Sequence, residues 1–224
     1  MHVADALEVL PTLPEDVVDA VITDPPYTLG SASSLRANGW ADTLNAARWY
    51  ADWYAECARI LRPDGVMWTL ANWRSLPVVL RAADLAGMHI GSVAVWDKRW
   101  IGPGGSRGLR SRYELCVLMP MPRWRQPDRS APDVWEIQGI VTRKPSGHPA
   151  EKPLDLLRHI VRLSALPAGG ALVLDPFAGS GTTLAAAAEA GHAAFGVEAA
   201  AHWADTAVRR IAERKRAPAV SGGV

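Results

Sequence analysis

The stretch GALVLDPFAGSGTT, residues 170–183, joins an apolar run to a glycine-rich turn and then to the start of a helix. Residues 170–174 predict a buried strand, and the alanine-rich residues 184–190 continue the helix. A strand that passes into a helix through glycines is the ligand-binding corner of doubly wound α/β folds. The stretch therefore predicts a Rossmann-like α/β fold with a doubly wound, mostly parallel sheet.

Two common glycine-rich sites fit this stretch poorly. A P-loop carries a lysine directly before its Ser or Thr, but Gly181 stands in that place, and Asp175 would repel a polyphosphate. A dinucleotide fingerprint needs a third glycine, which is missing at the proper spacing after Gly179 and Gly181. Residues 193–198 predict a further strand that ends in an acid, and such an acid suits the hydroxyls of a ribose. The ligand predicted here contains a nucleoside.

A second motif lies about 150 residues earlier in the chain. Residues 17–23 predict a buried strand, and Asp24-Pro25-Pro26-Tyr27 follows it directly. The two prolines end the strand, because they cannot extend a sheet ladder. The Asp24 carboxylate is then displayed at the carboxyl edge of the sheet beside rigid carbonyls and an aromatic ring. This set of acceptors suits a flat ring that bears an amine, such as a nucleobase turned out of its stack.

Together these motifs resemble the S-adenosylmethionine-dependent amino-methyltransferases of DNA, which modify adenine N6 or cytosine N4. Residues 24–27 resemble the catalytic motif of that family, and residues 175–181 resemble its cofactor loop. Residues 148–154 resemble the motif that precedes the cofactor loop, and residues 3–7 resemble the acid-containing segment before the catalytic strand. The order, with the catalytic motif first and the cofactor loop last, is that of the beta group.

The resemblance implies direct methyl transfer to a flipped base. Asp24 and the Pro25 carbonyl would accept the two amine hydrogens, and Tyr27 would stack on the base, with Pro26 completing the motif. For S-adenosylmethionine, the resemblance assigns the adenine amine to Asp5, the ribose hydroxyls to Glu198 and the methionine carboxylate to Lys152. The other implied cofactor residues are Asp175, Phe177, Gly179, Ser180, Gly181 and Thr182.

Several of these residues also have a purely structural interpretation. Asp5 suits the N-cap of a helix that begins at Ala6. Lys152 suits the exposed first turn of a helix, and Glu198 suits a surface acid. Phe177 is equally compatible with a core aromatic, and Asp24 with a residue of a strand-ending turn. The sequence leaves these alternatives open.

Length and composition agree with one α/β domain. The chain has 224 residues, of which 49% are hydrophobic, and this is enough to fill a single core. We expect a catalytic domain over residues 1–216 and a flexible tail over residues 217–224. Since no apolar run of about 18 residues and no signal-like start occur, we expect a cytoplasmic protein without membrane contact.

The two cysteines, Cys57 and Cys116, lack the spacing of a metal site or a disulfide framework. We expect both to be packing thiols and expect no metal. A cytosine C5 methyltransferase would need a nucleophilic cysteine in a loop, and Cys57 falls in a predicted helix while Cys116 falls in a predicted strand.

Charge is unevenly distributed along the chain. The net charge is +1, but residues 97–147 carry ten basic and five acidic residues, or +5, which leaves −4 elsewhere. We interpret this segment as an inserted target-recognition region, with a solvated loop region as the alternative. Trp100, Trp124 and Trp135 lie in it and suit packing better than base stacking. The residues predicted to contact DNA are Arg107, Arg110, Arg112, Arg123 and Arg125.

The remaining pattern alternates between helices and strands. Residues 62–65 predict a turn, and residues 120–132 an extended crossing. Further strands are predicted at 66–70, 90–96 and 113–118, and helices at 46–61, 75–86, 152–166 and 200–214.

The function expected from the resemblance is methylation of adenine N6 in double-stranded DNA. Cytosine N4 or an RNA base is the alternative within the same chemistry, and an inactive DNA-binding regulator that retains the cofactor is the alternative of a different class. A homodimer and a restriction endonuclease on a separate chain are the protein partners compatible with such an enzyme.

Overall fold

The computed structural model describes residues 1–26, 40–101, 108–141, 144–168 and 170–216. Two residues predicted for the site, Tyr27 and Arg107, lie outside these ranges, and so does the predicted tail.

The described residues form an eight-stranded sheet in the order β1-β8-β7-β2-β3-β5-β4-β6. Neighbouring strands from β1 to β3 are parallel, whereas β5 is antiparallel to both β3 and β4, and β6 is parallel to β4. The prediction of a doubly wound, mostly parallel sheet is confirmed. The strands are β1 His2–Val3, β2 Val18–Thr23, β3 Leu61–Ala71, β4 Ser92–Asp97, β5 Tyr113–Pro120, β6 Val134–Glu136, β7 Leu172–Asp175 and β8 Ala193–Glu198.

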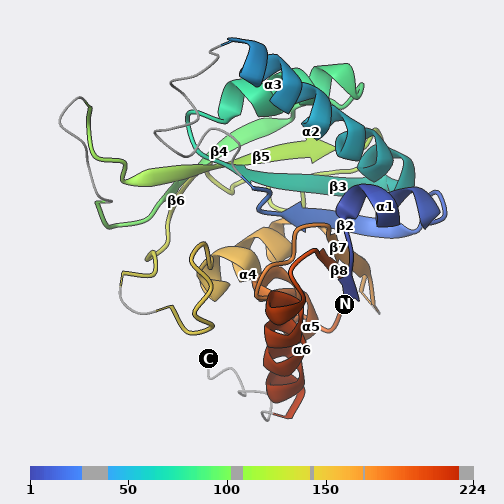
Figure 1. The fold of residues 1–224 in the computed structure, drawn as a ribbon, viewed down its shortest axis with the longest axis vertical. Helices are drawn as coiled ribbons and strands as arrows, with labels where there is room; N and C mark the ends of the chain where they lie inside the picture. The colour runs from blue at the N-terminus through green and yellow to red at the C-terminus, as the bar shows by residue number, and fades with distance from the viewer. Residues whose placement is uncertain (27–39, 102–107, 142–143, 169, 217–224) are drawn as a thin grey trace.

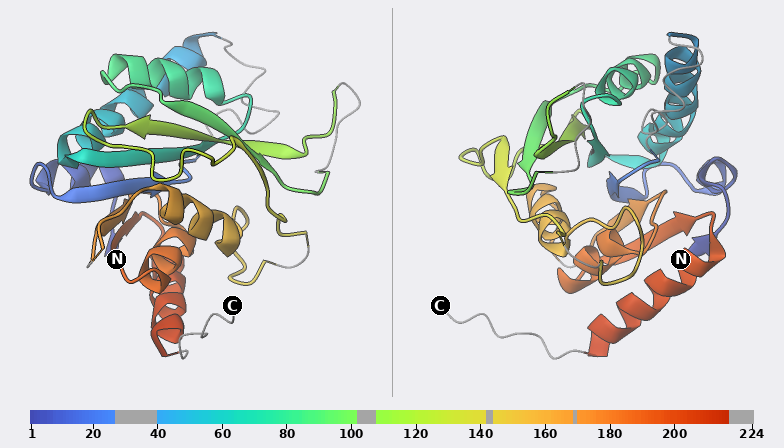
Figure 2. Two further views of the ribbon diagram at one scale, coloured as in Figure 1. Left: turned by 180° about the vertical axis from the view of Figure 1, so that it is seen from behind. Right: turned by 60° about the vertical axis from the view of Figure 1, so that its left-hand side comes forward.

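Helices cover both faces of the sheet (Figure 1). Helices α2 and α3 lie on one face, while α4, α5 and α6 lie on the other, and Figure 2 shows the same two layers from other sides. The helices are α1 Ala6–Val9, the 3-10 helix η1 Leu10–Thr12, α2 Trp40–Ile60, α3 Leu76–Leu85, α4 Leu154–Leu163, α5 Thr182–Glu189 and α6 Ala201–Arg216.

Alternating side chains of the central strands fill two cores. Val21 of β2 and Met67 of β3 belong to the core under α2 and α3. The adjacent residues Ile22 and Trp68 belong to the core shared with α4 and α5. Successive strand residues point to opposite faces, so a strand between two helical layers is apolar at nearly every position. This explains why these strands could be predicted as continuous apolar runs.

The boundaries of α2 and β3 differ most from their predictions, and those of the other elements differ by three residues or fewer. Helix α2 begins at Trp40, before the predicted start at residue 46. The predicted turn at residues 62–65 lies within β3, where the pairing with β2 shifts, since Val18 pairs with Leu61 but Ala20 pairs with Val66. The turn residues therefore form an irregularity in the strand, as Pro and Gly within a strand often do.

The central segment contains one strand that the sequence did not predict. β6 lies just after the extended crossing predicted at residues 120–132, and it pairs in parallel with β4. Trp124 and Trp135 are buried in the core around α4, so the preference for packing is confirmed for both. Cys57 and Cys116 are fully buried, as expected for packing thiols.

Candidate active site

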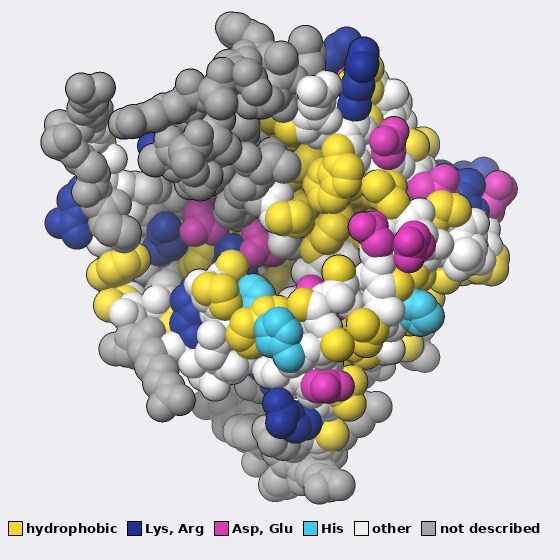
Figure 3. Space-filling view, in the orientation of Figure 1, with side chains coloured by type: hydrophobic (Ala, Val, Ile, Leu, Met, Phe, Trp, Pro, Cys, Tyr) yellow, Lys and Arg dark blue, Asp and Glu magenta, His cyan; other side chains and the backbone are white. Residues whose placement is uncertain are grey.

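The two predicted motifs meet in one cavity of about 570 Å³. β2, β7 and β8 are parallel neighbours, so their carboxyl ends lie at the same edge of the sheet. Charged and histidine side chains lie beside a hydrophobic area in the middle of this face of the molecule (Figure 3). Of the predicted catalytic and cofactor residues that the structure describes, all except Gly181 line the cavity: Asp5, Asp24, Pro25, Pro26, Lys152, Asp175, Phe177, Gly179, Ser180, Thr182 and Glu198.

Asp24 stands directly after β2 with its two carboxylate oxygens in different environments. Oδ2 is ion-paired with Lys152 Nζ, and the Asp24 side chain is only 22% exposed. Oδ1 is buried and has no hydrogen-bond partner among the described residues. A buried acceptor without a donor is costly, since it has given up its bonds to water. One oxygen is thus anchored, while the other is available to a donor on a ligand.

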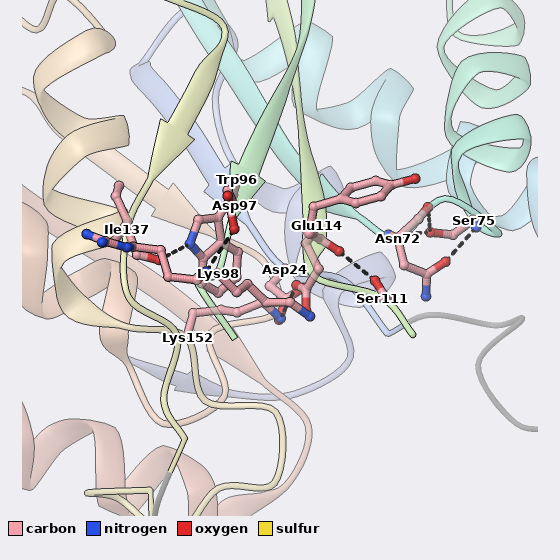
Figure 4. Close-up of polar contacts among 12 residues, drawn as sticks. Asp24, Asn72, Ser75, Trp96, Asp97, Lys98, Ser111, Glu114, Ile137 and Lys152 are labelled. Atoms are coloured by element: carbon pink, nitrogen blue, oxygen red, sulfur yellow. Dashed lines mark hydrogen bonds and ion pairs between the residues drawn. The ribbon is translucent and has the colours of Figure 1, made fainter. Parts of the chain in front are cut away.

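Lys152 lies between two carboxylates. Its Nζ pairs with Asp24 and is 3.5 Å from Glu114 Oε2, and Glu114 Oε1 is 3.3 Å from Lys98 Nζ (Figure 4). Burial by itself lowers the pKa of Lys152, but the charges of Asp24 and Glu114 and its hydrogen bonds to both outweigh burial and raise that pKa. Lys152, whose side chain is 11% exposed, is therefore a largely buried cation. Its contact with a methionine carboxylate stays a prediction.

Tyr50, which sequence reasoning missed, supports the catalytic motif from α2. Its hydroxyl donates a hydrogen bond to the Pro26 carbonyl over 3.1 Å. Burial, and secondarily the charge of Asp24, raise the pKa of Tyr50, so its hydroxyl stays protonated and remains a donor. The contact fixes the turn that follows Asp24. No sequence signal distinguishes Tyr50 from the other aromatic residues of the helix predicted at residues 46–61.

Asp175 joins the cofactor loop to the catalytic strand. Its Oδ1 accepts hydrogen bonds from Thr23 Oγ1 at 2.7 Å and from the Phe177 backbone nitrogen at 3.1 Å. Burial raises the pKa of Asp175 to about 6 even though these hydrogen bonds oppose the shift. Because Thr23 directly precedes Asp24, the two motifs are physically connected at this point.

Glu198, at the end of β8, holds the backbone on two sides of the cavity. Its Oε2 accepts a hydrogen bond from the Gly179 nitrogen, and its Oε1 accepts one from the Ala200 nitrogen, each over 2.9 Å. It is therefore a structural anchor of the cofactor loop. Each carboxylate oxygen can accept a second hydrogen bond, so the predicted bonds from ribose hydroxyls remain compatible with this geometry.

The two loop glycines serve different needs. Gly179 has φ 49°, and a Cβ there would lie 3.4 Å from the His148 ring in the cavity wall. Gly181 has φ 77°, and a Cβ there would lie 2.7 Å from Ala207 Cβ on α6. Gly181 is thus required for the packing of α6, and its predicted contact with the cofactor stays untested.

Arg210, also missed, binds the cofactor loop from α6. Its Nη1 donates to Thr182 Oγ1 at 2.9 Å and lies 3.4 Å from Ser180 Oγ. Its Nη2 is 2.9 Å from Oε1 of Glu151, whose side chain is fully buried beside Lys152 in the chain. Arg210 therefore links the loop at Ser180 to the segment that carries Lys152.

Asp5 and Phe177 adopt their structural roles and still line the cavity. Asp5 caps α1, since its Oδ1 accepts a hydrogen bond from the Leu7 nitrogen at 2.8 Å. The Phe177 ring packs against Trp49 and Trp53 with centroid distances of 5.6 and 5.0 Å. The structural and functional interpretations of these two residues do not exclude each other.

The arginines predicted to contact DNA lie at opposite ends of the strands of the sheet. Arg112 forms two hydrogen bonds of 2.7 Å with Asp97, and Arg110 donates to the Ile101 carbonyl, both at the edge that carries Asp24. Arg123 follows the far end of β5, where its backbone nitrogen donates to the Pro63 carbonyl.

The guanidinium of the fifth predicted DNA contact, Arg125, donates to the carbonyls of Pro122 and Trp124, near Arg123. The structure therefore does not bring Arg123 and Arg125 together with Arg110 and Arg112.

The side chains of the cavity suit a cationic nucleoside better than a phosphate. They include five carboxylates and one lysine, and the Trp49 and Phe177 rings add flat apolar surface. Carboxylates can accept hydrogen bonds from ribose hydroxyls and stabilise a positive charge, whereas they repel polyphosphate. The sulfonium and ribose of S-adenosylmethionine fit this set.

Two structural features are absent from the described part of the chain. It contains no group of three or more His, Cys, Asp or Glu side chains arranged to hold a metal ion. It also contains no helix that combines the length and apolarity needed to span a bilayer.

Comparison with known proteins identifies relatives over nearly the whole chain. A sequence profile of the N6/N4 family described as DNA methylase matches residues 18–209. YubD of Escherichia coli K12, named as a methylase, is 29% identical over 95% of this chain and 90% of its own length. YhdJ of the same strain, named as a DNA adenine methyltransferase, is 27% identical over 92% of this chain and 80% of its own length.

The solved structures that resemble this chain include DNA methylases as well. TTHA0409 of Thermus thermophilus, named as a DNA modification methylase and solved with S-adenosyl-L-methionine, has a TM-score of 0.74 and 27% identity, with 95% of this chain and 93% of that chain covered. The PvuII cytosine-N4 DNA methyltransferase has a TM-score of 0.76 over 93% of this chain and 84% of that chain. At 18% identity, the PvuII enzyme shares the fold alone.

Proposed function

The chain belongs to the N6/N4 DNA methylase family, and from this membership we propose that it methylates N6 of adenine in double-stranded DNA. It is a DNA methyltransferase that uses S-adenosylmethionine, and the choice of base is the finer step. Adenine is favoured because the motif from Asp24 onward has the Asp-Pro-Pro-Tyr form associated with adenine in the beta group. The similarity to YhdJ, which is named for adenine, supports the same choice.

The observation that carries the proposal is the unpaired oxygen of Asp24. An exocyclic amine is a poor nucleophile, because its lone pair is conjugated with the ring. Asp24 Oδ1, buried and without a donor among the described residues, can accept an amine hydrogen and draw the nitrogen toward tetrahedral geometry. It is also placed to take the proton that the methylated amine loses.

The surrounding residues hold this oxygen in place. Lys152 fixes Asp24 Oδ2 through its ion pair, and Tyr50 holds the Pro26 carbonyl that follows. The hydrogen bond from Thr23 to Asp175 aligns the catalytic strand with the cofactor loop. S-adenosylmethionine supplies an electrophilic methyl group when it is bound. Such an arrangement works by orientation of the two reactants.

A covalent intermediate on a cysteine is not part of this proposal. Cys57 and Cys116 are fully buried, and neither lines the cavity. Burial is the main cause that raises the pKa of both thiols, which disfavours the thiolate needed for attack on a base.

Analysis of the modified nucleoside tests the proposal. DNA from cells that lack adenine methylation and express the chain would be digested and measured by mass spectrometry, and modification-sensitive sequencing would locate the modified bases. We expect N6-methyladenine with the wild type and with Asp64→Asn, a control at an exposed carboxylate, and none with Asp24→Asn. N4-methylcytosine would contradict the choice of base, and methylation of RNA alone would contradict the substrate.

A finding of neither modified base would favour the regulator that binds the cofactor without transferring its methyl group. A homodimer and a restriction endonuclease on a separate chain remain proposals for its protein partners. Light scattering of the purified chain would test the first, and co-purification with the product of an adjacent endonuclease gene would test the second.

A further inference from the structure

A rigid turn between β3 and α3 presents an aromatic and a basic side chain to solvent. Trp73 is 52% exposed, and the Arg74 Cζ atom lies 4.6 Å from the centroid of its ring. Asn72 Oδ1 accepts hydrogen bonds of 2.9 Å from the backbone nitrogens of both Arg74 and Ser75. The turn is therefore fixed by its own hydrogen bonds, and the guanidinium is already stacked on the indole.

This turn stands at the catalytic edge of the sheet. β2 and β3 are parallel neighbours in which Thr23 pairs with Thr69, so the turn after β3 and the motif after β2 leave the sheet on the same side. Adjacent strands are about 4.8 Å apart, which places the turn one strand away from Asp24. Figure 4 shows Asn72 and Ser75 on the far side of Glu114 from Lys152.

Similar side chains continue along this edge. β5 starts there with Tyr113, which is 39% exposed, and β4 ends there, followed by Trp100, which is 37% exposed. Arg112 pairs with Asp97 at the same place. We call this set the aromatic-basic rim; it comprises Trp73, Arg74, Trp100, Arg110, Arg112 and Tyr113.

The rim has the composition that nucleic acid requires. Guanidinium groups bind phosphates, and exposed aromatic faces pack on unstacked bases. An enzyme that turns a base out of a duplex leaves the neighbouring bases partly unstacked, and an apolar side chain beside the cavity can cover them. A rim of aromatic rings and guanidinium groups at the strand ends that carry the cavity thus favours DNA over an apolar protein surface.

We propose that the Trp73–Arg74 turn is a DNA contact, in which Arg74 binds a phosphate and Trp73 packs against a base beside the target. The proposal rests on the proposed function and extends the DNA surface beyond the basic segment at residues 97–147. It assigns the two residues separable effects, because a phosphate contact depends on salt and a stacking contact does not.

The test is the salt dependence of binding to a labelled 30-base-pair duplex of mixed sequence, followed by fluorescence anisotropy. We expect Arg74→Gln to reduce the slope of log affinity against log salt by about 0.9. We expect Trp73→Ala to weaken binding by about 10-fold or more while the slope is unchanged. Arg81→Gln and Leu80→Ala, at exposed positions on α3, serve as matched controls and should bind DNA as the wild type does.

The affinity for S-adenosylmethionine, measured by calorimetry, reports whether each variant is folded and should stay within about 2-fold of the wild type. Wild-type affinity and slope in both rim variants would overturn this proposal and leave the proposed function intact. Loss of DNA affinity together with loss of cofactor affinity would also overturn it, because the turn would then be structural. A wild-type chain that neither binds nor methylates DNA would overturn the proposed function itself.

Discussion

The parallel and the reversed halves of the sheet carry the site in different ways. In the parallel half, from β1 to β3, each strand delivers its carboxyl end to one edge, so residues as distant in sequence as Thr23 and Asp175 share a hydrogen bond. In the reversed half, β5 runs antiparallel to its neighbours. The arginines that precede β5 in sequence and those that follow it therefore lie at opposite ends of the strands.

The two halves differ in how distance along the sequence relates to distance in space. Motifs that follow parallel strands meet in space however far apart they are in the chain. Residues that are close in sequence separate when the strand between them crosses the sheet, since eight residues of strand extend over about 26 Å. The basic segment consequently forms two surfaces, and only one of them lies at the strand ends that carry the cavity.

Among the substitutions that test this comparison, the largest effect is expected at Lys152, where the two halves touch through Glu114. Lys152→Met leaves the partly buried carboxylates of Asp24 and Glu114 without their shared cation, and breaking a fully buried pair costs about 3–5 kcal/mol, which is an upper limit here. We expect the rate of methyl transfer to fall by about 100-fold or more. Lys98→Met, which removes a lysine that contacts Glu114, should reduce the rate of methyl transfer much less. Equal reductions in rate for the two variants would show that the ion pair of Lys152 with Asp24 has no special role.

Gly181→Ala tests the packing of the parallel half. The left-handed backbone and the approach to Ala207 should together reduce the free energy of unfolding by about 3 kcal/mol in urea denaturation. Gly191→Ala is the matched control, because Gly191 has φ 81° but no atom within 4 Å of the added Cβ. We expect a loss of about 1 kcal/mol there. Similar losses at both positions would exclude a packing role for Gly181.

Asp175 should give the parallel half a distinctive pH dependence. Burial raises its pKa to about 6 from an ordinary 3.8, so the folded protein retains the proton over a range in which the unfolded chain loses it. Its contribution to stability is therefore present below pH 4 and decreases as the pH rises to about 6, by about 2–3 kcal/mol. Asp175→Asn removes this titration, so the free energy of unfolding of the wild type relative to the variant should fall across that range. If the free energies of unfolding of the wild type and the variant changed in parallel with pH, the raised pKa of Asp175 would be refuted.

The smallest effect is expected from the arginines at the far edge. Arg123→Gln combined with Arg125→Gln should change the affinity for duplex DNA by less than about 2-fold, because both residues follow the end of β5 that is opposite to the cavity. Arg110→Gln combined with Arg112→Gln should weaken binding by about 10-fold and reduce the salt slope. If the far-edge pair had the larger effect, DNA would cover both edges of the sheet, and the comparison above would fail.

The fold and the principal site residues could be predicted from sequence because they follow strands. A buried strand that ends in Asp24 or Asp175 is a local pattern, and the parallel arrangement then brings the two ends together. Tyr50, Glu114 and Arg210 could not be predicted, since they reach the site through tertiary packing. Nothing local distinguishes Arg210 from its neighbour Arg209, yet only Arg210 is paired with the buried Glu151.

The alternatives at Asp5 and Phe177 show a related limit. A helix cap and a core aromatic are local roles, and the structure confirms both while placing the same residues in the cavity wall. Sequence alone treats such roles as competing, although one side chain can fill both.

The central claim is that Asp24 accepts a hydrogen of the target amine in a pocket built from both motifs. The direct test compares wild type and Asp24→Asn for transfer of labelled methyl groups to DNA at saturating S-adenosylmethionine, with cofactor affinity measured by calorimetry. Replacing the carboxyl group of Asp24 by an amide should slow transfer by about 1,000-fold and change cofactor affinity by less than about 3-fold. Transfer within about 10-fold of the wild type would contradict the claim.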